Sequence, residues 1–430
     1  MWFFALGERG REEAPVAVNH PLFSNPGPAL VPPPAAQVRL PSGALPGAQS
    51  EQQTPRVRMV RGWPYKLEAI ALTLVGFTGF FFLLQSGQGP SVPKEVTIET
   101  WTLGPETTTR APRPACRANT SAANVPGFAD LPAHIQDFLR YKHCRDFPLL
   151  LDAPHKCVRT EVFLLLAIKS SPGNYERRAA IRQTWGQERT FEGAPIRRVF
   201  LFGVAPDPRE SGKLNRLLAM EASDFGDVLQ WGFWDTFFNL TLKQTLFHGW
   251  LAERCPAAKF VFNGDDDVFA NTDNMVRYLS GVPPGHLFTG HLIARVGPIR
   301  EKWSKYYIPE QVTTAKDYPP YCGGGGLLMS GHTAHAIHEA SRALDLFPID
   351  DVFLGMCLQR AGLAPASHLA MRTVGLRVPS SNPSPSFDPC HYRELLLSHR
   401  FRPYEMQLMW RELHSKRLRC GKKVAVYPKI

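Results

Sequence analysis

The stretch Phe260-Val-Phe-Asn-Gly-Asp-Asp-Asp-Val-Phe269 joins an apolar run directly to three consecutive aspartates, and apolar residues follow them at once. An apolar run bounded in this way indicates a buried strand, so Asp265, Asp266 and Asp267 are predicted to emerge together at its C-terminal end. Ligands of open α/β sheets bind outside the carboxyl ends of the strands. Adjacent carboxylates repel one another, and a cation among them relieves that repulsion. The stretch therefore predicts a site for Mg²⁺ or Mn²⁺, with a solvated acidic turn as the alternative.

Alternating strand and helix patterns surround this stretch. Residues 162–168 and 198–203 are predicted to be strands, whereas 214–225 and 240–254 have helical periods. Strands that alternate with helices of about 10–15 residues indicate βαβ units. We therefore expect an α/β fold with a mostly parallel sheet.

Composition limits the class of protein. The chain has 430 residues, 44% of them hydrophobic, and a formal net charge of +11. Its basic residues are scattered and form no nucleic-acid-binding motif, so we expect no nucleic-acid partner. The eight cysteines form no CxxC pair, which argues against a zinc site and favours disulfides in an oxidising compartment.

The N-terminal part predicts a membrane anchor. Residues 69–84 carry no charge, and basic residues are more frequent before this run than after it, which places the N-terminus in the cytosol. A cleaved signal peptide is the alternative. The predicted segments are a disordered cytosolic region (1–64), a transmembrane signal-anchor helix (65–85), a Pro/Thr-rich lumenal stem (86–150) and a folded domain (151–430). N-glycosylation sequences begin at Asn119 and Asn239 and would lie in the lumen.

Several blocks occur together in one order along the chain. Ile181-Arg-Gln-Thr-Trp185, Asp265-Asp-Asp-Val268 and Asp350-Asp-Val-Phe-Leu-Gly355 resemble the signature blocks of the inverting β1,3-glycosyltransferases. Trp303-Ser-Lys-Tyr-Tyr-Ile-Pro309 and Tyr321-Cys-Gly-Gly-Gly-Gly326 are similar to the N-acetylglucosaminyltransferase subgroup of that family. The resemblance covers roughly residues 116–420, and the long N-terminal segment departs from it.

The resemblance implies a Rossmann-like GT-A catalytic domain, with helices on both faces of its sheet, in a single-pass type II Golgi membrane protein. It implies transfer of N-acetylglucosamine from UDP-N-acetylglucosamine to terminal galactose of glycoprotein glycans. The linkage would be β1,3, the mechanism inverting and the cofactor Mn²⁺ or Mg²⁺. Core 1 O-glycans and poly-N-acetyllactosamine are both possible acceptors. The alternatives are a β1,3-galactosyltransferase of the same fold and a catalytically inactive membrane-anchored lectin.

The resemblance also implies roles on the donor side. Asp267 corresponds to the metal-binding acid, and His399 is the candidate for a second metal ligand, with an ordinary surface histidine as the alternative. Arginines at a helix start can serve phosphate, although arginines on a solvated helix face are common. The residues expected to bind the donor are Lys169, Ser170, Arg177, Arg178, Asp265 and Asp266.

A general base is needed to activate the acceptor hydroxyl. Asp350 and Asp351 lie together in an apolar segment. The resemblance implies that the second acid, Asp351, is the base, and Asp350 is expected to serve capping or acceptor support. Glycines at 324 and 325 would allow a close approach to the sugar. Aromatic rings at 303, 306 and 307 either stack on sugar or lie in the core, the core being favoured for Tyr307. The predicted acceptor-binding residues are Trp303, Tyr306, Gly324, Gly325 and Asp350.

Overall fold

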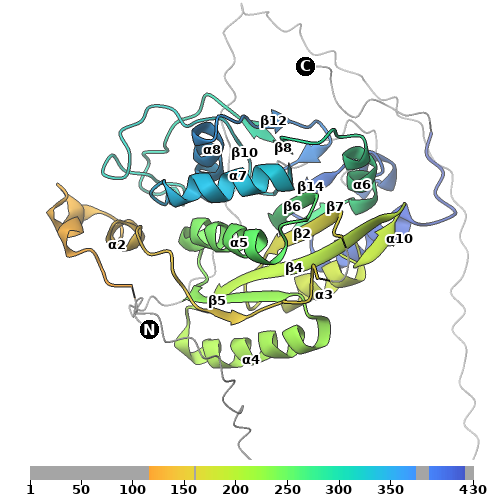
Figure 1. The fold of residues 1–430 in the computed structure, drawn as a ribbon, viewed down its shortest axis with the longest axis horizontal. Coiled ribbons are helices and arrows are strands. Elements are labelled where there is room, and N and C mark those ends of the chain that lie inside the picture. Colours follow the sequence, from red (N-terminus) through yellow and green to blue (C-terminus); the bar gives the residue numbers. More distant parts are fainter. Residues whose placement is uncertain (1–115, 159–160, 374–386, 422–430) are drawn as a thin grey trace, which may run out of the picture. The chain divides into compact units, whose positions relative to one another are not determined.

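The computed structural model describes residues 116–158, 161–373 and 387–421 (Figure 1). The predicted cytosolic segment 1–64, the predicted membrane span 65–85 and the first part of the predicted stem lie outside these ranges. Within the ranges described, no helix is long and apolar enough to cross a membrane. The anchor and its orientation therefore stay predictions.

In the described part of the chain, nine strands form one mixed sheet. Eight of them follow the order β1-β5-β4-β2-β6-β11-β8-β12, and β3 pairs with the outer part of β4. The strands of this sheet are β1 (Leu149–Leu151), β2 (Leu164–Lys169), β3 (Arg189–Phe191), β4 (Ala194–Val204), β5 (Val228–Trp234), β6 (Phe260–Asp265), β8 (Phe288–Gly290), β11 (Gly326–Ser330) and β12 (Ala366–Ser367).

The prediction of a mostly parallel sheet needs correction, because the sheet is mixed: parallel pairs form its centre and the short β8–β12 edge, and the other pairs are antiparallel. Strands β5, β4, β2 and β6 pair in parallel, but β11 runs antiparallel to both β6 and β8, and β1 runs antiparallel to β5. The helix–strand alternation that predicts parallel pairing stops after β6. Since β11 starts opposite the carboxyl end of β6, with Gly326 facing Gly264, the glycine-rich turn before β11 lies beside the aspartates.

Two smaller sheets complete the fold. One pairs β9 with β10, and the other has the order β13-β14-β7. Their strands are β7 (Val268–Ala270), β9 (Leu292–Ile293), β10 (Tyr321–Cys322), β13 (Met371–Arg372) and β14 (Leu397–His399).

Helices cover both faces of the main sheet, as expected (Figure 1). Alternate residues of β2 point to opposite faces: Leu165 belongs to the apolar cluster under α5, α7 and α8, whereas Leu164 and Leu166 belong to the cluster that includes α3, α6 and α10. The helices are α2 (Ala133–Tyr141), α3 (Tyr175–Gln183), α4 (Pro208–Phe225), α5 (Leu240–Arg254), α6 (Thr272–Ser280), α7 (Gly331–Arg342), α8 (Asp350–Arg360), α9 (Pro389–Tyr392) and α10 (Pro403–Leu413), with short 3₁₀ turns η1 (Thr120–Asn124), η2 (Phe128–Asp130) and η3 (Phe237–Asn239).

Residues 116–150, which the sequence analysis placed in the stem, are folded onto the domain. Strand β1 pairs with β5, the Lys142 ammonium lies 2.6 Å from the Asp345 carboxylate, and Arg145 Nη1 donates to the Ser341 carbonyl. The folded body therefore includes chain well before residue 151.

The expectation of disulfides is confirmed for six of the eight cysteines, all eight of which lie in the described ranges. One disulfide closes the N-terminal segment, one ties the end of α5 to the loop before β2, and one closes the C-terminal segment. The pairs are Cys116–Cys144, Cys157–Cys255 and Cys390–Cys420. Cys322 and Cys357 are buried free thiols.

Candidate active site

The three consecutive aspartates lie at the carboxyl end of β6, as the sequence predicts. Asp265 is the last residue of β6, and β7 begins at Val268, so the acids form the turn between two strands. Strand β14 pairs antiparallel with β7 and sets His399 opposite Val268. This pairing, together with the hydrogen bond from the Phe401 amide to the Asp267 carbonyl, brings a residue from far along the chain to the acids.

Asp265, Asp267 and His399 form a group that could hold a divalent cation. One ligand atom from each lies within 4.8 Å of the others, and His399 Nε2 is 3.0 Å from Asp267 Oδ1. His399 Nδ1 donates to the Thr373 carbonyl at 2.9 Å, and Nε2 faces the Asp267 carboxylate, to which the protonated ring donates; a bound cation would take the place of the Nε2 proton. Two carboxylates and one imidazole suit Mn²⁺, and Mg²⁺ when substrate phosphates add oxygen ligands. The structure thus brings together the two predicted metal ligands, Asp267 and His399.

The protonation of this group follows from its contacts. Burial alone would raise the pKa of Asp267, but the hydrogen bond and charge of His399, with the charge of Arg177, hold that pKa below its ordinary value. Burial would lower the pKa of His399, whereas Asp267 raises it above its ordinary value. The Asp267 carboxylate is therefore ionised at neutral pH and available to a cation.

Asp266 has a different role from its two neighbours. It is buried, and its carboxylate accepts hydrogen bonds from Ser170 Oγ (2.6 Å), Asn174 Nδ2 (2.9 Å) and Arg177 Nη1 (2.8 Å). This geometry does not favour direct donor binding by Asp266 or by the Ser170 side chain, because the Ser170 hydroxyl and the Asp266 carboxylate bond to each other. Asp266 instead fixes the turn between β2 and α3 and orients Arg177.

Arg177 and Arg178 are neighbours with opposite environments. The Arg177 side chain is 39% exposed, and its guanidinium lies 4.0 Å from the Asp267 carboxylate, so it borders the candidate metal group. The Arg178 side chain is fully buried, forms two hydrogen bonds with Glu221 and donates to the Ser171 and Pro172 carbonyls. The fully buried Arg178 guanidinium, held by Glu221, thus supports the loop, and a role for it in donor binding stays a prediction that this geometry does not favour.

Lys169 connects the metal side of the site to α8. This buried lysine lies 3.1 Å from Asp265 Oδ1 and 2.9 Å from Asp350 Oδ2. Burial would lower the pKa of Lys169, but the charges of Asp265, Asp350 and Asp351 hold it well above the ordinary value. Lys169 therefore acts as a fixed positive charge between carboxylates, and its ammonium is committed to them rather than free for the donor.

Asp350 does not cap α8. The N-cap position is Ile349, no side-chain cap hydrogen bond is present, and the Asp350 carboxylate is buried against Lys169. The predicted capping role of Asp350 is therefore corrected, whereas its contact with the acceptor stays a prediction. Asp351 is the more accessible acid of the two.

Asp351 lies against the glycine-rich turn. Its carboxylate accepts a hydrogen bond from the Gly324 backbone. A Cβ atom at residue 324 would come within 2.7 Å of Asp351 Oδ2, and one at Gly325 within 3.2 Å of the His399 ring. Burial, followed by the charge of Asp350, raises the pKa of Asp351 well above its ordinary value against the opposing charge of Lys169. The glycines thus allow the backbone to approach the acid and the metal-side histidine, and a raised pKa suits a general base.

The aromatic residues proposed for the acceptor side differ in exposure. Trp303 is 87% exposed and Tyr306 is 41% exposed, with the Tyr306 ring edge-on to Phe237, whereas Tyr307 is buried in the core as favoured above. The sequence reasoning gave no role to Tyr321, whose pKa is raised to about 12 by burial and then by the nearby charge of Asp351. Its position directly before Cys322 and the glycine turn is the signal that could have identified it.

The two N-glycosylation sequences differ in environment. Asn119 is exposed and its side-chain oxygen accepts from the Ser121 amide, which leaves its amide nitrogen outward. Asn239 is half-buried and donates to the Trp234 carbonyl, and the Thr241 hydroxyl donates to the Phe347 carbonyl. Modification of both stays a prediction.

Comparison with known proteins adds to this geometry. The family profile described as galactosyltransferase matches residues 176–368. Human N-acetyllactosaminide β-1,3-N-acetylglucosaminyltransferase 3 is 57% identical over 79% of this chain and 90% of its own. The chain belongs to the galactosyltransferase family. Within that family, it is also similar to human acetylgalactosaminyl-O-glycosyl-glycoprotein β-1,3-N-acetylglucosaminyltransferase, at 56% identity over 72% of this chain and 82% of the relative.

Other galactosyltransferase-family relatives are more distant. Rat UDP-GlcNAc:betaGal β-1,3-N-acetylglucosaminyltransferase 7 is 45% identical over 72% of this chain and 79% of its own. Among solved structures, galactosyltransferase LgtC with donor and acceptor sugar analogues covers 58% of this chain and 96% of that chain, at 14% identity and a TM-score of 0.32. The family assignment rests on the sequence relatives.

Proposed function

We propose that this chain transfers N-acetylglucosamine from UDP-N-acetylglucosamine in β1,3 linkage to terminal galactose of glycoprotein glycans, through a GT-A catalytic domain. The observation that carries the proposal is that a candidate metal group and a candidate base lie on the same glycine turn. The metal group is Asp265, Asp267 and His399, the base is Asp351, and Gly324 lies against Asp351 while Gly325 lies against His399. Relatives named as β1,3-N-acetylglucosaminyltransferases, one of them 57% identical, supply the donor and the linkage.

On the donor side, Asp267, His399 and Asp265 would hold Mn²⁺ or Mg²⁺. The cation would supply Lewis-acid stabilisation of the charge that develops on the leaving diphosphate. Arg177, held in place by Asp266, presents part of its guanidinium at the edge of this cluster and suits a phosphate oxygen. Lys169 keeps Asp265 in position through a 3.1 Å ion pair.

On the acceptor side, Asp351 would accept the proton of the attacking galactose hydroxyl. Its raised pKa makes it a stronger base than an ordinary aspartate. Attack on the face opposite the departing UDP inverts the anomeric centre, so an α-linked donor gives a β product. Asp350 and Lys169 form the buried pair behind the base and fix the start of α8.

The acceptor would be recognised by exposed aromatic rings. Trp303 and Tyr306 are accessible for stacking on the apolar faces of sugars, whereas Tyr307 is not. Both core 1 O-glycans and poly-N-acetyllactosamine present terminal galactose. One relative is named for an N-acetyllactosaminide acceptor, whereas another is named for an acetylgalactosaminyl O-glycoprotein, so the first name supports the galactose acceptor. The retained acids argue against an inactive lectin, and the named relatives argue against a β1,3-galactosyltransferase.

The cellular setting is part of the proposal. We propose a single-pass type II protein of the Golgi membrane, with residues 1–64 in the cytosol and the folded domain in the lumen. Three disulfides in the folded part are in keeping with an oxidising lumen. Protease treatment of intact microsomes tests the orientation: digestion of the folded domain without detergent would contradict it.

A panel of radiolabelled UDP-sugars tests the donor and the activity together. Each donor is supplied with galactose-terminated and N-acetylglucosamine-terminated acceptors and Mn²⁺. The proposal expects transfer of N-acetylglucosamine to the galactose-terminated acceptors. Transfer of galactose instead would favour the galactosyltransferase alternative, and an absence of transfer with all donors would favour the lectin.

A further inference from the structure

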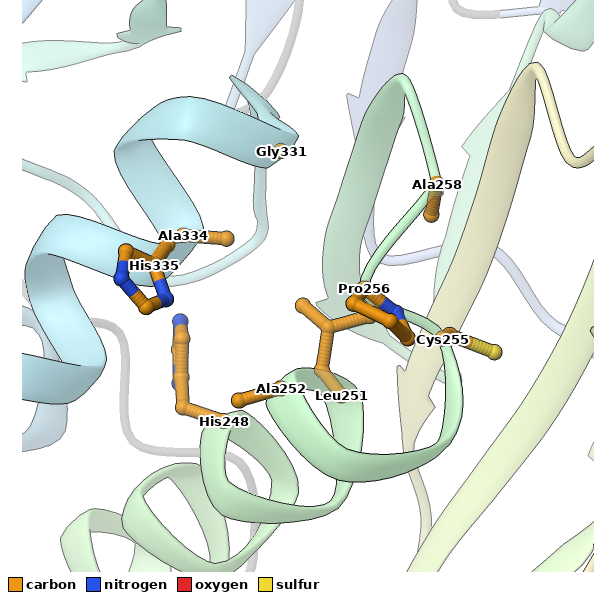
Figure 2. A pocket seen from close by; sticks show the side chains of 9 residues that line it. All are labelled: His248, Leu251, Ala252, Cys255, Pro256, Ala258, Gly331, Ala334 and His335. Atoms are coloured by element: carbon orange, nitrogen blue, oxygen red, sulfur yellow. The ribbon is translucent and has the colours of Figure 1, made fainter.

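A small cavity lies between α5 and α7, at the end of the sheet opposite the aspartates (Figure 2). Ala258, just before β6, and Gly331, just after β11, form part of its wall, whereas Asp265 lies at the other end of β6. The cavity has a volume of about 70 Å³. It is therefore separate from the candidate active site and has room for an ion with water.

His248 of α5 supplies an unpaired imidazole nitrogen to this cavity. The residue is 1% exposed, and its Nδ1 lies 2.8 Å from the Gln244 carbonyl. Since Nδ1 donates to that carbonyl, Nε2 carries a lone pair, and Nε2 is buried without a hydrogen-bond partner. Figure 2 shows the His248 ring directed toward His335 of α7. An imidazole fixed by a backbone carbonyl in this way is the arrangement common among metal-binding histidines.

Two histidines of α7 approach His248. His335 is exposed and lines the cavity, and His338 follows one turn later with a buried Nδ1 that has no hydrogen-bond partner. Burial lowers the pKa of His248 to about 4, and the charge of His338 acts in the same direction. Burial also lowers the pKa of His338, and His335 contributes to that shift. The neutral imidazole is the form that binds metals, and the lone pair of His248 Nε2, fixed by the bond from Nδ1 to the Gln244 carbonyl, is directed into the cavity.

We propose that the His248–His335 cavity is a site for a transition-metal dication of the zinc class. His248 Nε2 and the His335 ring are the protein ligands, and water completes the coordination. Imidazole ligands favour Zn²⁺ over the oxygen-seeking Mg²⁺ and Mn²⁺ of the active site. Cys255 also lines the cavity, but its sulfur is held in a disulfide and is no ligand. A bound ion would link α5 to α7 and stabilise their packing.

Titration calorimetry with Zn²⁺ tests this site in the full chain without a polyhistidine tag. Asp267→Ala serves as the background, so that the active-site group is weakened as a competitor. We expect one Zn²⁺ per chain and a higher melting temperature in its presence. Adding His335→Ala should weaken Zn²⁺ binding at least about tenfold. Loss of a residue that only supports a metal ligand already lowers metal affinity by about tenfold or more, and His335 is a ligand itself.

His332→Ala is the matched control, because His332 is also exposed on α7 but does not line the cavity. It should leave Zn²⁺ affinity unchanged. His248→Gln, which shortens the ligand and keeps a polar group, should weaken binding as His335→Ala does. No Zn²⁺ binding in the Asp267→Ala background, or equal weakening by His332→Ala and His335→Ala, would overturn the proposal.

Discussion

Asp267 and His399 are 132 residues apart in the chain, yet His399 Nε2 lies 3.0 Å from Asp267 Oδ1. Three features produce this contact: the antiparallel pairing of β14 with β7, the amide of Phe401 on the Asp267 carbonyl, and the Thr373 carbonyl that fixes the imidazole. The metal group thus depends on the C-terminal part of the domain as much as on the aspartates themselves.

His399→Ala should weaken activation by Mn²⁺ at least about tenfold while leaving the fold intact, because it removes one ligand from a group of three. Asp267→Ala should abolish transfer. The measurement is the rate of transfer as a function of Mn²⁺ concentration, with the melting temperature as the check on folding. A chelator should stop the wild-type enzyme reversibly, and full activity in chelator would refute the metal mechanism.

Adjacent arginines should give opposite phenotypes. Arg177→Met should raise the KM for the UDP-sugar with little change in melting temperature, because the side chain is partly exposed at the edge of the metal group. Arg178→Met should destabilise the protein by about 1–3 kcal/mol, because it removes two hydrogen bonds from buried Glu221 and leaves Arg182 as its remaining ion-pair partner. Urea unfolding gives the free energy of unfolding of each variant, and donor kinetics give its KM for the UDP-sugar. If the two variants changed both values equally, the distinction between a donor-binding Arg177 and a structural Arg178 would be wrong.

Gly324→Ala should disturb the base directly. The added methyl would come within 2.7 Å of Asp351 Oδ2, so the carboxylate must move, and we expect turnover to fall at least about tenfold, or 1.4 kcal/mol in the barrier. Gly173→Ala is the control, since a Cβ atom there meets nothing within 4 Å. Comparable losses in both variants would mean that crowding at Asp351 is not the cause.

Lys169→Met should shift the pH dependence. The base must be ionised, so kcat/KM rises with pH through the pKa of Asp351. Burial and Asp350 raise that pKa and the Lys169 charge lowers it. Removing the charge raises the pKa further, so the acidic limb of the profile should move to higher pH. If Lys169→Met is folded and the acidic limb of its kcat/KM profile stays at the wild-type pH, Asp351 is not the group that titrates in that limb.

The sequence predicted the strand that carries the aspartates, because an apolar run that ends in three acids has few other interpretations. Through the resemblance, it also predicted helices on both faces of the sheet and a shared metal role for Asp267 and His399. It did not predict the antiparallel β11, because a glycine turn after a long loop carries no signal of strand direction. The antiparallel start of β11 is nevertheless what brings Gly324 to Asp351.

The sequence was least informative about which polar residues are already bonded within the protein. Arg178 and Asp350 have the residue types and positions of donor- and acceptor-binding groups, but the fold buries both against opposite charges. Asp266 likewise stands between two acids of the metal group and bonds away from it. Such distinctions depend on contacts between distant segments, which local pattern does not encode.

Asp351→Asn should also affect stability. A carboxyl whose pKa is raised in the folded state favours its protonated form there, so its ionisation destabilises the fold as the pH rises above the unfolded pKa, near 4. The neutral amide removes this penalty. The melting temperature of Asp351→Asn at pH 7 should therefore equal or exceed that of the wild type, and a large decrease would contradict the account of the buried acid.

The central claim is that Asp351 is the base of an inverting N-acetylglucosamine transfer. The most direct measurement is the turnover of wild type and Asp351→Asn with UDP-N-acetylglucosamine and a galactose-terminated disaccharide, at matched donor saturation, with the linkage of the product determined by NMR. The account predicts a β1,3-linked product, a loss of at least about 10²-fold in the variant and an unchanged donor affinity. Near wild-type turnover in Asp351→Asn, or an α-linked product, would contradict it.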